Sequence, residues 1–419
     1  MSEHDPIPSD QISVSRKLVF AAITLFLVLF VIEAATYVFI KINLDKNELF
    51  YDSKPLELAF NSDDYLDYLA HRDPAVGWPR RDWYGANIGS KYFLDSSGAR
   101  VSPAFPVPGS ACVSLYGDSF TAGSGVDDVH AWGNVMAEKL GCRVANYGYG
   151  GYGTDQSYLR FVENKSDESD VVILSHMTGI ITRNISQWRA FANFPPNYAG
   201  WRDLKPRFIV DENGKLQLIP LPTLSVEEFQ SAIQNPSSFF PHDFYAPGGP
   251  GGLVTAKFPF ILTLYRAYRS QFLRNGGASG TWIQAHYDRD YLSDGYRVTK
   301  GILDSFFEEA RNRGKKALVL FIPHRKEIKH FIKTGEWFSD PLAADVALSG
   351  AQVVNVGAGM IDRAGPKEIC NLFENPRCGG HFNERGYAML ADIAFEALRG
   401  SPAGPHQQDG WDETLDPLD

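Results

Sequence analysis

The chain opens with one long apolar stretch. Residues 18–40 are 23 consecutive positions with a single charged side chain, Glu33. As a helix this stretch is about 34 Å long, enough to cross a hydrocarbon core of about 30 Å. It is too long for the apolar region of a signal peptide, and no Ala-x-Ala cleavage site follows it. We therefore expect a single transmembrane helix at 18–40, preceded by a cytoplasmic tail at 1–17.

From Ala111 onward, short apolar runs alternate with amphipathic segments. The runs predict buried strands, and the segments between them predict helices. The strands are expected at 112–116, 142–146, 171–176, 317–322 and 352–356, and the helices at 130–140, 156–163, 298–313 and 387–398. Strands that alternate with helices predict an α/β domain, at 111–400, with a parallel sheet covered by helices.

Three segments do not show this alternation of strands and helices. Residues 41–110 carry prolines and turn residues, which predict a strand-poor lead-in segment packed on the main domain. Residues 185–295 carry prolines, a hairpin signal at 208–218 and a run of glycines, which we interpret as an insertion beside the sheet ends. The polar, acidic segment 401–419 is typical of a disordered tail.

Composition and charge exclude some classes of function. The 419 residues carry a net charge of −10, with no basic block outside the N-terminal flank, so we expect no nucleic-acid partner. The sequence contains no Cys-x-x-Cys motif and no histidine cluster, so we expect no metal and no cofactor.

The four cysteines permit disulfides without requiring them. Cys112 and Cys142 would each open a strand, and these strands are expected to be neighbours. Cys370 and Cys378 enclose a loop that ends three residues before His381. They form either a disulfide in an oxidising compartment or two buried thiols without a role, and both interpretations stay open.

Candidate chemistry begins at Gly117-Asp118-Ser119, directly after the first strand. A serine at a strand-to-helix turn lies where backbone N–H groups point outward, which suits a nucleophile in acyl transfer. On the tripeptide alone, a plain turn with a capping serine would be the better interpretation. Two later motifs change this balance, namely Asn146-x-Gly148-x-x-Gly151-Tyr-Gly153 after the second strand and Gly380-His381-Phe-Asn-x-x-Gly386 before the last helix.

In this order and spacing, the three motifs resemble the first, second and last conserved blocks of the SGNH (GDSL-type) hydrolase superfamily, and they cover most of residues 110–400. The resemblance implies a flavodoxin-like three-layer fold. It implies that Ser119 is the nucleophile and His381 the general base, and that the backbone N–H groups of Ser119 and Gly151 form an oxyanion hole.

The apolar helix with its internal Glu33, followed by Gly77-Trp78 and Gly98-Ala-Arg100, is similar to a membrane-anchored bacterial branch of that superfamily. This resemblance implies a single-pass protein of the bacterial inner membrane with a periplasmic or extracellular catalytic domain. The basic residues that flank the helix do not decide its orientation, because both ends carry them.

The chain departs from the family pattern at two places. The third block normally supplies an asparagine to the oxyanion hole, but here the strand leads into His176-Met-Thr-Gly-Ile, and the nearest asparagine is Asn184. Either Asn184 is reached by a longer turn or the hole lacks a donor. The aspartate that normally lies two or three residues before the histidine is also absent. A carboxylate for His381 would then come from Glu374 or Asp362, or Ser119 and His381 form a dyad oriented by a backbone carbonyl.

The sequence predicts a membrane-anchored serine esterase or acyl-transfer enzyme. Its expected partners are the membrane, through residues 18–40, and an acylated glycan or lipid of the cell envelope as substrate. The alternative is a catalytically weak or inactive protein of the same fold that serves as a glycan-binding scaffold, as the two departures would favour. A lipase for soluble substrates is a third possibility, which the apolar helix disfavours.

Overall fold

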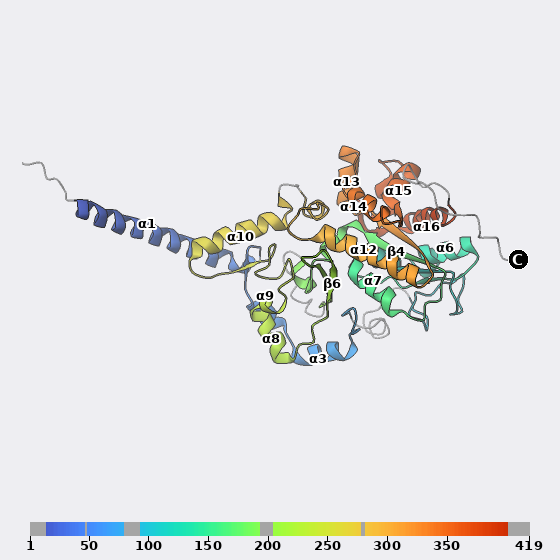
Figure 1. The fold of residues 1–419 in the computed structure, drawn as a ribbon, viewed down its shortest axis with the longest axis horizontal. Helices are drawn as coiled ribbons and strands as arrows, with labels where there is room; N and C mark the ends of the chain where they lie inside the picture. The colour runs from blue at the N-terminus through green and yellow to red at the C-terminus, as the bar shows by residue number, and fades with distance from the viewer. Residues whose placement is uncertain (1–13, 47, 79–92, 193–203, 278–280, 401–419) are drawn as a thin grey trace, which may run out of the picture.

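The computed structural model describes residues 14–46, 48–78, 93–192, 204–277 and 281–400 (Figure 1). At its centre is a five-stranded parallel sheet with the strand order β3-β2-β4-β8-β9. The strands are β2 (Val113–Tyr116), β3 (Val144–Asn146), β4 (Val171–Met177), β8 (Lys316–Ile322) and β9 (Gln352–Asn355). This is the 2-1-3-4-5 order of flavodoxin-like folds, so the predicted α/β class is confirmed. The expected tails at 1–13 and 401–419 lie outside the described residues.

Helices cover both faces of the sheet. Because successive side chains on a strand point to opposite faces, Leu318 and Leu320 pack into one core cluster while Val319 and Phe321 pack into another. The first face is covered by α6 (Trp132–Leu140), α15 (Val356–Ala364) and α16 (Glu384–Leu398), and the second by α7 (Thr154–Glu163), α12 (Gly295–Asn312) and α14 (Asp340–Ala347). The result is a three-layer sandwich, and the predicted strands and helices all occur within a few residues of their expected bounds.

The lead-in segment and the insertion pack on each other. The lead-in contributes β1 (Phe50–Tyr51), α2 (Lys54–Ala59) and α3 (Ser62–His71). The insertion contributes β5 (Arg207–Val210), β6 (Leu216–Ile219), α8 (Val226–Gln234), α9 (Pro236–Phe239), β7 (Val254–Thr255), α10 (Phe260–Arg274) and α11 (Trp282–Ala285). Tyr65 of α3 stacks on Phe229 of α8 with ring centroids 4.5 Å apart, in one cluster with the buried Trp188.

Buried carboxylates fix the insertion in place. Asp243 accepts hydrogen bonds from the backbone N–H groups of Gln187 at 2.6 Å and Trp188 at 2.8 Å. The buried Lys205 forms an ion pair with Asp155 of α7. The insertion is therefore anchored near the carboxyl ends of the strands, since α7 begins in the segment that follows β3.

The N-terminal helix α1 (Val14–Asn43) projects away from the sheet (Figure 1). Most of its apolar side chains are exposed, with Phe26 at 68% and Leu29 at 51%. The segment Ser15–Asn43 is long and apolar enough to cross a membrane, and a signal sequence would show the same length and composition.

Two disulfides are present. Cys112 and Cys142 lie just before the paired strands β2 and β3, with their Cα atoms 6.2 Å apart. Cys370 and Cys378, with Cα atoms 4.4 Å apart, enclose β10 (Phe373–Asn375), which pairs antiparallel with β11 (Gly379–Phe382). Of the two interpretations left open for the second pair, the structure shows the disulfide.

Candidate active site

Ser119 lies at the carboxyl end of β2, where the chain turns into the short helix α5 (Ser119–Ala122). The preceding Asp118 is fully buried, and its Oδ1 accepts a hydrogen bond from the Phe120 N–H at 3.0 Å, so it caps this helix. Strand β2 has β3 on one side and β4 on the other, so the strand order reverses beside it. Ligands of open α/β sheets bind at such a switch point, outside the carboxyl ends of the strands.

His381 reaches the same place from the other end of the domain. It lies on β11, three residues before α16 begins, and its Nε2 is 2.9 Å from the Ser119 Oγ. The Phe120 ring packs against the imidazole with centroids 5.1 Å apart. The two residues predicted to be nucleophile and base are thus brought within hydrogen-bonding distance across 262 positions of sequence.

A carboxylate lies beside this histidine. The Glu374 Oε2 accepts a hydrogen bond from the His381 backbone N–H at 3.2 Å. Two glycines leave room for the carboxylate, since a Cβ on Gly125 would lie 2.1 Å from Oε1 and a Cβ on Gly380 would lie 2.2 Å from Oε2. The two carboxylates considered from the sequence are both exposed, and the structure places Glu374 next to His381 and Asp362 on α15.

The glycine-rich segment after β3 packs directly on the Ser119 turn. The Tyr149 N–H donates to the Gly117 carbonyl at 2.9 Å, and a Cβ on Gly148 would lie 2.4 Å from the Ala122 backbone nitrogen. Gly151 has φ +87°, and a Cβ there would lie 2.5 Å from Arg189 Nη1. The positive φ therefore favours glycine at position 151, whereas the close contact is with the flexible end of the Arg189 side chain.

Asn184 lies close to this segment, but its amide is already bonded. Its Nδ2 donates to Thr154 Oγ1 at 3.2 Å and to Thr299 Oγ1 at 2.8 Å, and its Oδ1 accepts from the Thr154 N–H at 2.9 Å. Both N–H groups are used to join α7 to α12. The structure thus gives Asn184 a role in holding the site together and leaves no amide hydrogen directed at Ser119.

A neutral histidine continues this network. His176 Nδ1 lies 2.8 Å from Thr154 Oγ1, and its Nε2 lies 2.8 Å from the Tyr287 hydroxyl. Since that hydroxyl donates to the Thr178 carbonyl, it accepts from Nε2–H, and Nδ1 accepts from Thr154. Burial lowers the pKa of His176 to about 3, so the ring stays neutral.

Arg183 is a site residue that sequence reasoning missed. Its Nη1 donates to the Tyr152 carbonyl at 2.8 Å and lies 3.7 Å from Asp118 Oδ2. Burial raises the pKa of Asp118, and the guanidinium charge opposes that rise. Arg183 therefore links the residue before the nucleophile to the residue after Gly151. The only signal in the sequence was its position directly before Asn184.

Another neutral histidine, His324, lies near Arg183 at the carboxyl end of β8. Burial, together with the charges of Arg325, Lys326 and Arg183, lowers the pKa of His324 to about 4. It is therefore neutral at physiological pH. His324 begins α13 (Arg325–Thr334), and its ring contacts the turn after β4 at Gly179.

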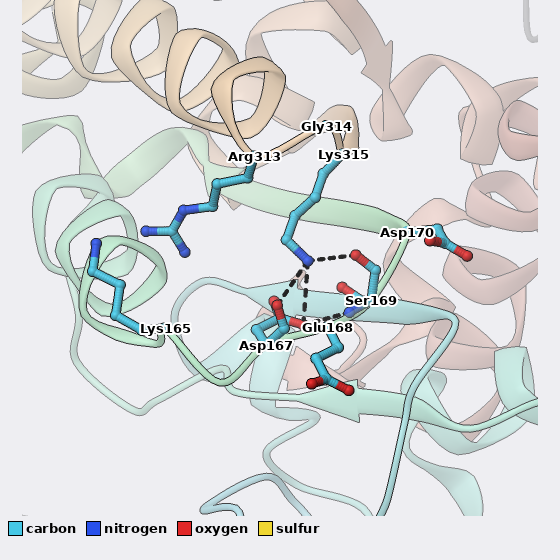
Figure 2. Close-up of a pocket in the computed structure, with 8 residues that line it drawn as sticks. All are labelled: Lys165, Asp167, Glu168, Ser169, Asp170, Arg313, Gly314 and Lys315. Carbon is cyan, nitrogen blue, oxygen red and sulfur yellow. Dashed lines mark hydrogen bonds and ion pairs between the residues drawn. The ribbon is translucent and has the colours of Figure 1, made fainter.

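A cavity of about 450 Å³ lies at the opposite edge of the sheet (Figure 2). The residues around it precede β4 and β8, so it faces the amino ends of the strands. Lys315 Nζ donates to the Asp167 carbonyl at 2.9 Å, and the Asp167 carboxylate accepts from Ser114 at 2.8 Å and from Tyr116 at 2.9 Å. Lys315 and Asp167 are thus used in the fold, and the cavity is remote from Ser119.

Within the described ranges, no group of three or more His, Cys, Asp or Glu side chains is arranged to hold a metal ion.

Comparison with known proteins adds little to this geometry. No family model matches the chain, and no curated protein matches it. Among solved structures, the chain is similar to one titled "Structure of a putative lipolytic protein of G-D-S-L family from Desulfitobacterium hafniense DCB-2". That similarity has a TM-score of 0.32 and 12% identity, and it covers 68% of this chain and 98% of the other. A likeness this remote carries no argument about activity.

Proposed function

We propose that the protein is a serine-dependent esterase or acyl-transfer enzyme of the SGNH type. The observation that carries this proposal is the 2.9 Å contact between Ser119 Oγ and His381 Nε2 at the switch point of the sheet. A hydroxyl that donates to a neutral imidazole is the arrangement of an activated serine nucleophile.

The reaction follows from this geometry. Ser119 Oγ attacks the acyl carbon of an ester while its proton passes to His381 Nε2. The tetrahedral intermediate then expels the alcohol, which takes that proton, and an acyl-serine remains. Water or a sugar hydroxyl next attacks the acyl-serine, giving hydrolysis or acyl transfer respectively, with His381 again accepting and returning the proton.

The oxyanion of the intermediate needs hydrogen-bond donors. We assign the backbone N–H groups of Ser119 and Gly151 to this role, because the Gly151 segment packs on the Ser119 turn and no side chain at 151 crowds the approach. Loss of one such donor typically raises the barrier by about 3 kcal/mol. In this assignment Asn184 joins α7 to α12 through Thr154 and Thr299 and donates no hydrogen bond to the substrate.

The charge that develops on His381 needs a counter-charge. We assign this role to Glu374. Its carboxylate accepts a hydrogen bond from the His381 backbone N–H, and it occupies space that larger residues in place of Gly125 and Gly380 would fill. Glu374 is a positioning residue in this scheme, because it acts on the substrate only through the imidazole.

The location and substrate belong to the same proposal. We propose that α1 is a single-pass anchor in the bacterial inner membrane and that the domain faces the periplasm or the cell exterior. The two disulfides support a compartment outside the cytosol. The proposed substrate is an O-acyl group, such as O-acetyl, on a cell-envelope glycan or lipid, the acylated molecules that an anchored domain meets there.

A glycan-binding scaffold without activity is the second candidate. It is favoured by the engaged amide of Asn184 and by the absence of an aspartate directly before His381. In such a scaffold the contact between Ser119 and His381 would serve the fold alone.

Hydrolysis of a small activated acetyl ester by the full-length protein in detergent separates the two candidates. The enzyme predicts turnover that Ser119→Ala lowers at least a thousandfold, with unchanged melting temperature. Ser124→Ala, a nearby serine whose side chain has no assigned role, is the matched control and should retain turnover. Equal rates in wild type and Ser119→Ala would contradict the proposal.

A further inference from the structure

The helix α10 presents large apolar side chains to the outside. Ile261, Tyr265, Tyr268 and Phe272 are 41%, 66%, 49% and 57% exposed, and Phe258 just before the helix is 74% exposed. The four helical positions are spaced by four, three and four residues, so they form one stripe along the helix.

The middle of the inward face of α10 carries small and polar residues. Thr263, Ala267 and Ser270 are buried there, and Leu273 and Arg274 are buried at the end of the helix. The Thr263 hydroxyl donates to the Lys257 carbonyl at 2.6 Å, and the Ser270 hydroxyl donates to the Gly252 carbonyl. A helix on the surface of a water-soluble domain has the opposite polarity. Small residues inside and large apolar residues outside are typical of helices that pack in lipid.

This helix begins against α1. The Glu33 carboxylate accepts hydrogen bonds from the backbone N–H groups of Phe260 at 2.5 Å and Ile261 at 3.3 Å. The Tyr37 ring lies 5.0 Å from the Phe260 ring, and Ile40 packs with Ala267. Figure 1 shows α10 alongside the C-terminal part of α1, between that part and the body of the domain.

These contacts explain the one charged residue within the apolar stretch. A carboxylate in a membrane helix is costly unless it is paired. The first N–H groups of α10 lack partners within their own helix and carry the positive end of its dipole. Glu33 satisfies those groups, and they in turn stabilise its charge.

The same contacts set the depth of α10. Glu33 lies seven residues before Ile40, or about 10 Å along the axis. Phe260, which contacts Glu33, lies seven residues before Ala267, which packs with Ile40. The two helices therefore run parallel. If 18–40 crosses the hydrocarbon core, Ile261 lies inside it and Tyr268 lies at its boundary, where membrane proteins enrich aromatic residues. Arg266 and Arg269 then lie within reach of the lipid headgroups.

We propose that the stripe of Ile261, Tyr265, Tyr268 and Phe272 is a lipid-contacting surface, so that α10 enters the membrane beside α1. The domain is then held at the bilayer by two elements, which restricts how it can turn relative to the membrane. The proposal rests on the membrane anchoring by α1 in the proposed function, and it does not depend on esterase activity.

The test uses the full-length protein in vesicles of phosphatidylethanolamine and phosphatidylglycerol. Tyr265→Cys is labelled with an environment-sensitive fluorophore, and quenching is measured with aqueous iodide and with lipids that carry a quencher on the acyl chain. Leu348→Cys is the matched control, since Leu348 is a large apolar residue that is 86% exposed and lies after α14, on the sheet domain. The native cysteines are all in disulfides and do not compete for the label.

We expect the label at 265 to be quenched at least fivefold more by the lipid-borne quencher than the label at 348, and to resist iodide. Quenching of both labels by iodide alone would overturn the proposal while leaving α1 as an anchor. A label at 265 shielded from both quenchers, with shielding that falls when the protein is diluted in the vesicles, would show contact with a second copy and also overturn it. Release of the full-length chain from vesicles by carbonate would overturn the anchoring together with this inference. None of these results bears on ester hydrolysis.

Discussion

At the scale of single residues, the position of the Glu374 carboxylate gives the sharpest prediction about catalysis. Glu374→Gln keeps an oxygen for the His381 backbone N–H but removes the negative charge. We expect kcat/KM for an acetyl ester to fall about tenfold, because the positive charge on His381 in the transition state loses its counter-charge.

Asp362→Asn is the matched control for this substitution. Asp362 is an exposed carboxylate on α15, and its removal changes the net charge equally. We expect an unchanged kcat/KM in this variant. If Glu374→Gln retained the wild-type kcat/KM, Glu374 would have no part in positioning His381.

A second residue-scale prediction concerns stability. Burial raises the pKa of Glu327 from 4.5 to about 7, although the Ser339 N–H donates to its carboxyl at 2.9 Å. Because the folded-state pKa is the higher one, the folded state favours the protonated form. Its stabilising contribution is complete below pH 4.5 and is lost as the pH rises through about 7. We expect wild type to lose about 2–3 kcal/mol of stability between pH 5 and 8 from this group.

Glu327→Gln should not show this loss, because an amide does not titrate. Denaturant unfolding of both proteins in detergent, at pH 5 and at pH 8, measures the difference. Parallel losses in wild type and variant would show that Glu327 is not the responsible group.

The residues of the site differ in how far sequence could predict them. Ser119, Gly151 and His381 lie in short motifs that together resemble the conserved blocks of a known superfamily, so the sequence was enough to nominate them. Arg183 acts by spanning two loops, and Glu374 by occupying space left by Gly125 and Gly380. Such contacts depend on tertiary packing, which no local pattern encodes.

At the scale of elements, the disulfide between Cys370 and Cys378 closes the loop that carries Glu374 and positions β11. In the chain-entropy view, cross-linking so short a loop contributes about 2.5 kcal/mol, and the longer loop between Cys112 and Cys142 about 3.5 kcal/mol. Replacing Cys370 and Cys378 by alanine should therefore lower both the melting temperature and kcat, because His381 lies on β11.

The matched control replaces Cys112 and Cys142 by alanine. This disulfide lies at the amino ends of β2 and β3, away from Ser119, so its loss should lower the melting temperature but leave kcat within about twofold. Equal effects of the two double variants on kcat would contradict a specific role for the Cys370–Cys378 loop.

Helices and strands, like single residues, could be predicted where a local pattern specifies them and could not where tertiary contacts do. The strands of the parallel sheet are buried on both faces and read as continuous apolar runs, so their positions were predicted closely. The β5–β6 hairpin was predicted from its turn residues. The shared core of α3 and α8 was not, because each segment alone carries too few apolar residues to indicate its partner. The unusual polarity of α10 becomes evident only when its buried and exposed faces are known.

At the scale of the whole molecule, α1 projects from a domain that contains two disulfides. The account places that domain outside the cytosol. Protease added to intact spheroplasts should digest the domain and leave the N-terminal tail protected. Detection with tags at the two termini would follow each part separately, and a cytosolic protein gives the control for intact spheroplasts. A domain digested only after lysis would place it in the cytosol.

The most direct test of the central claim is covalent capture of the nucleophile. A fluorophosphonate reacts with an activated serine by forming a phosphorus–oxygen bond with loss of fluoride, and peptide mass spectrometry locates the adduct. The account predicts an adduct on Ser119 in wild type, none on Ser119→Ala, and labelling at least a hundredfold slower in His381→Ala, because the base that takes the serine proton is missing. An unlabelled Ser119 under conditions that label a control serine esterase, or equal labelling of Ser119 with and without His381, would contradict it.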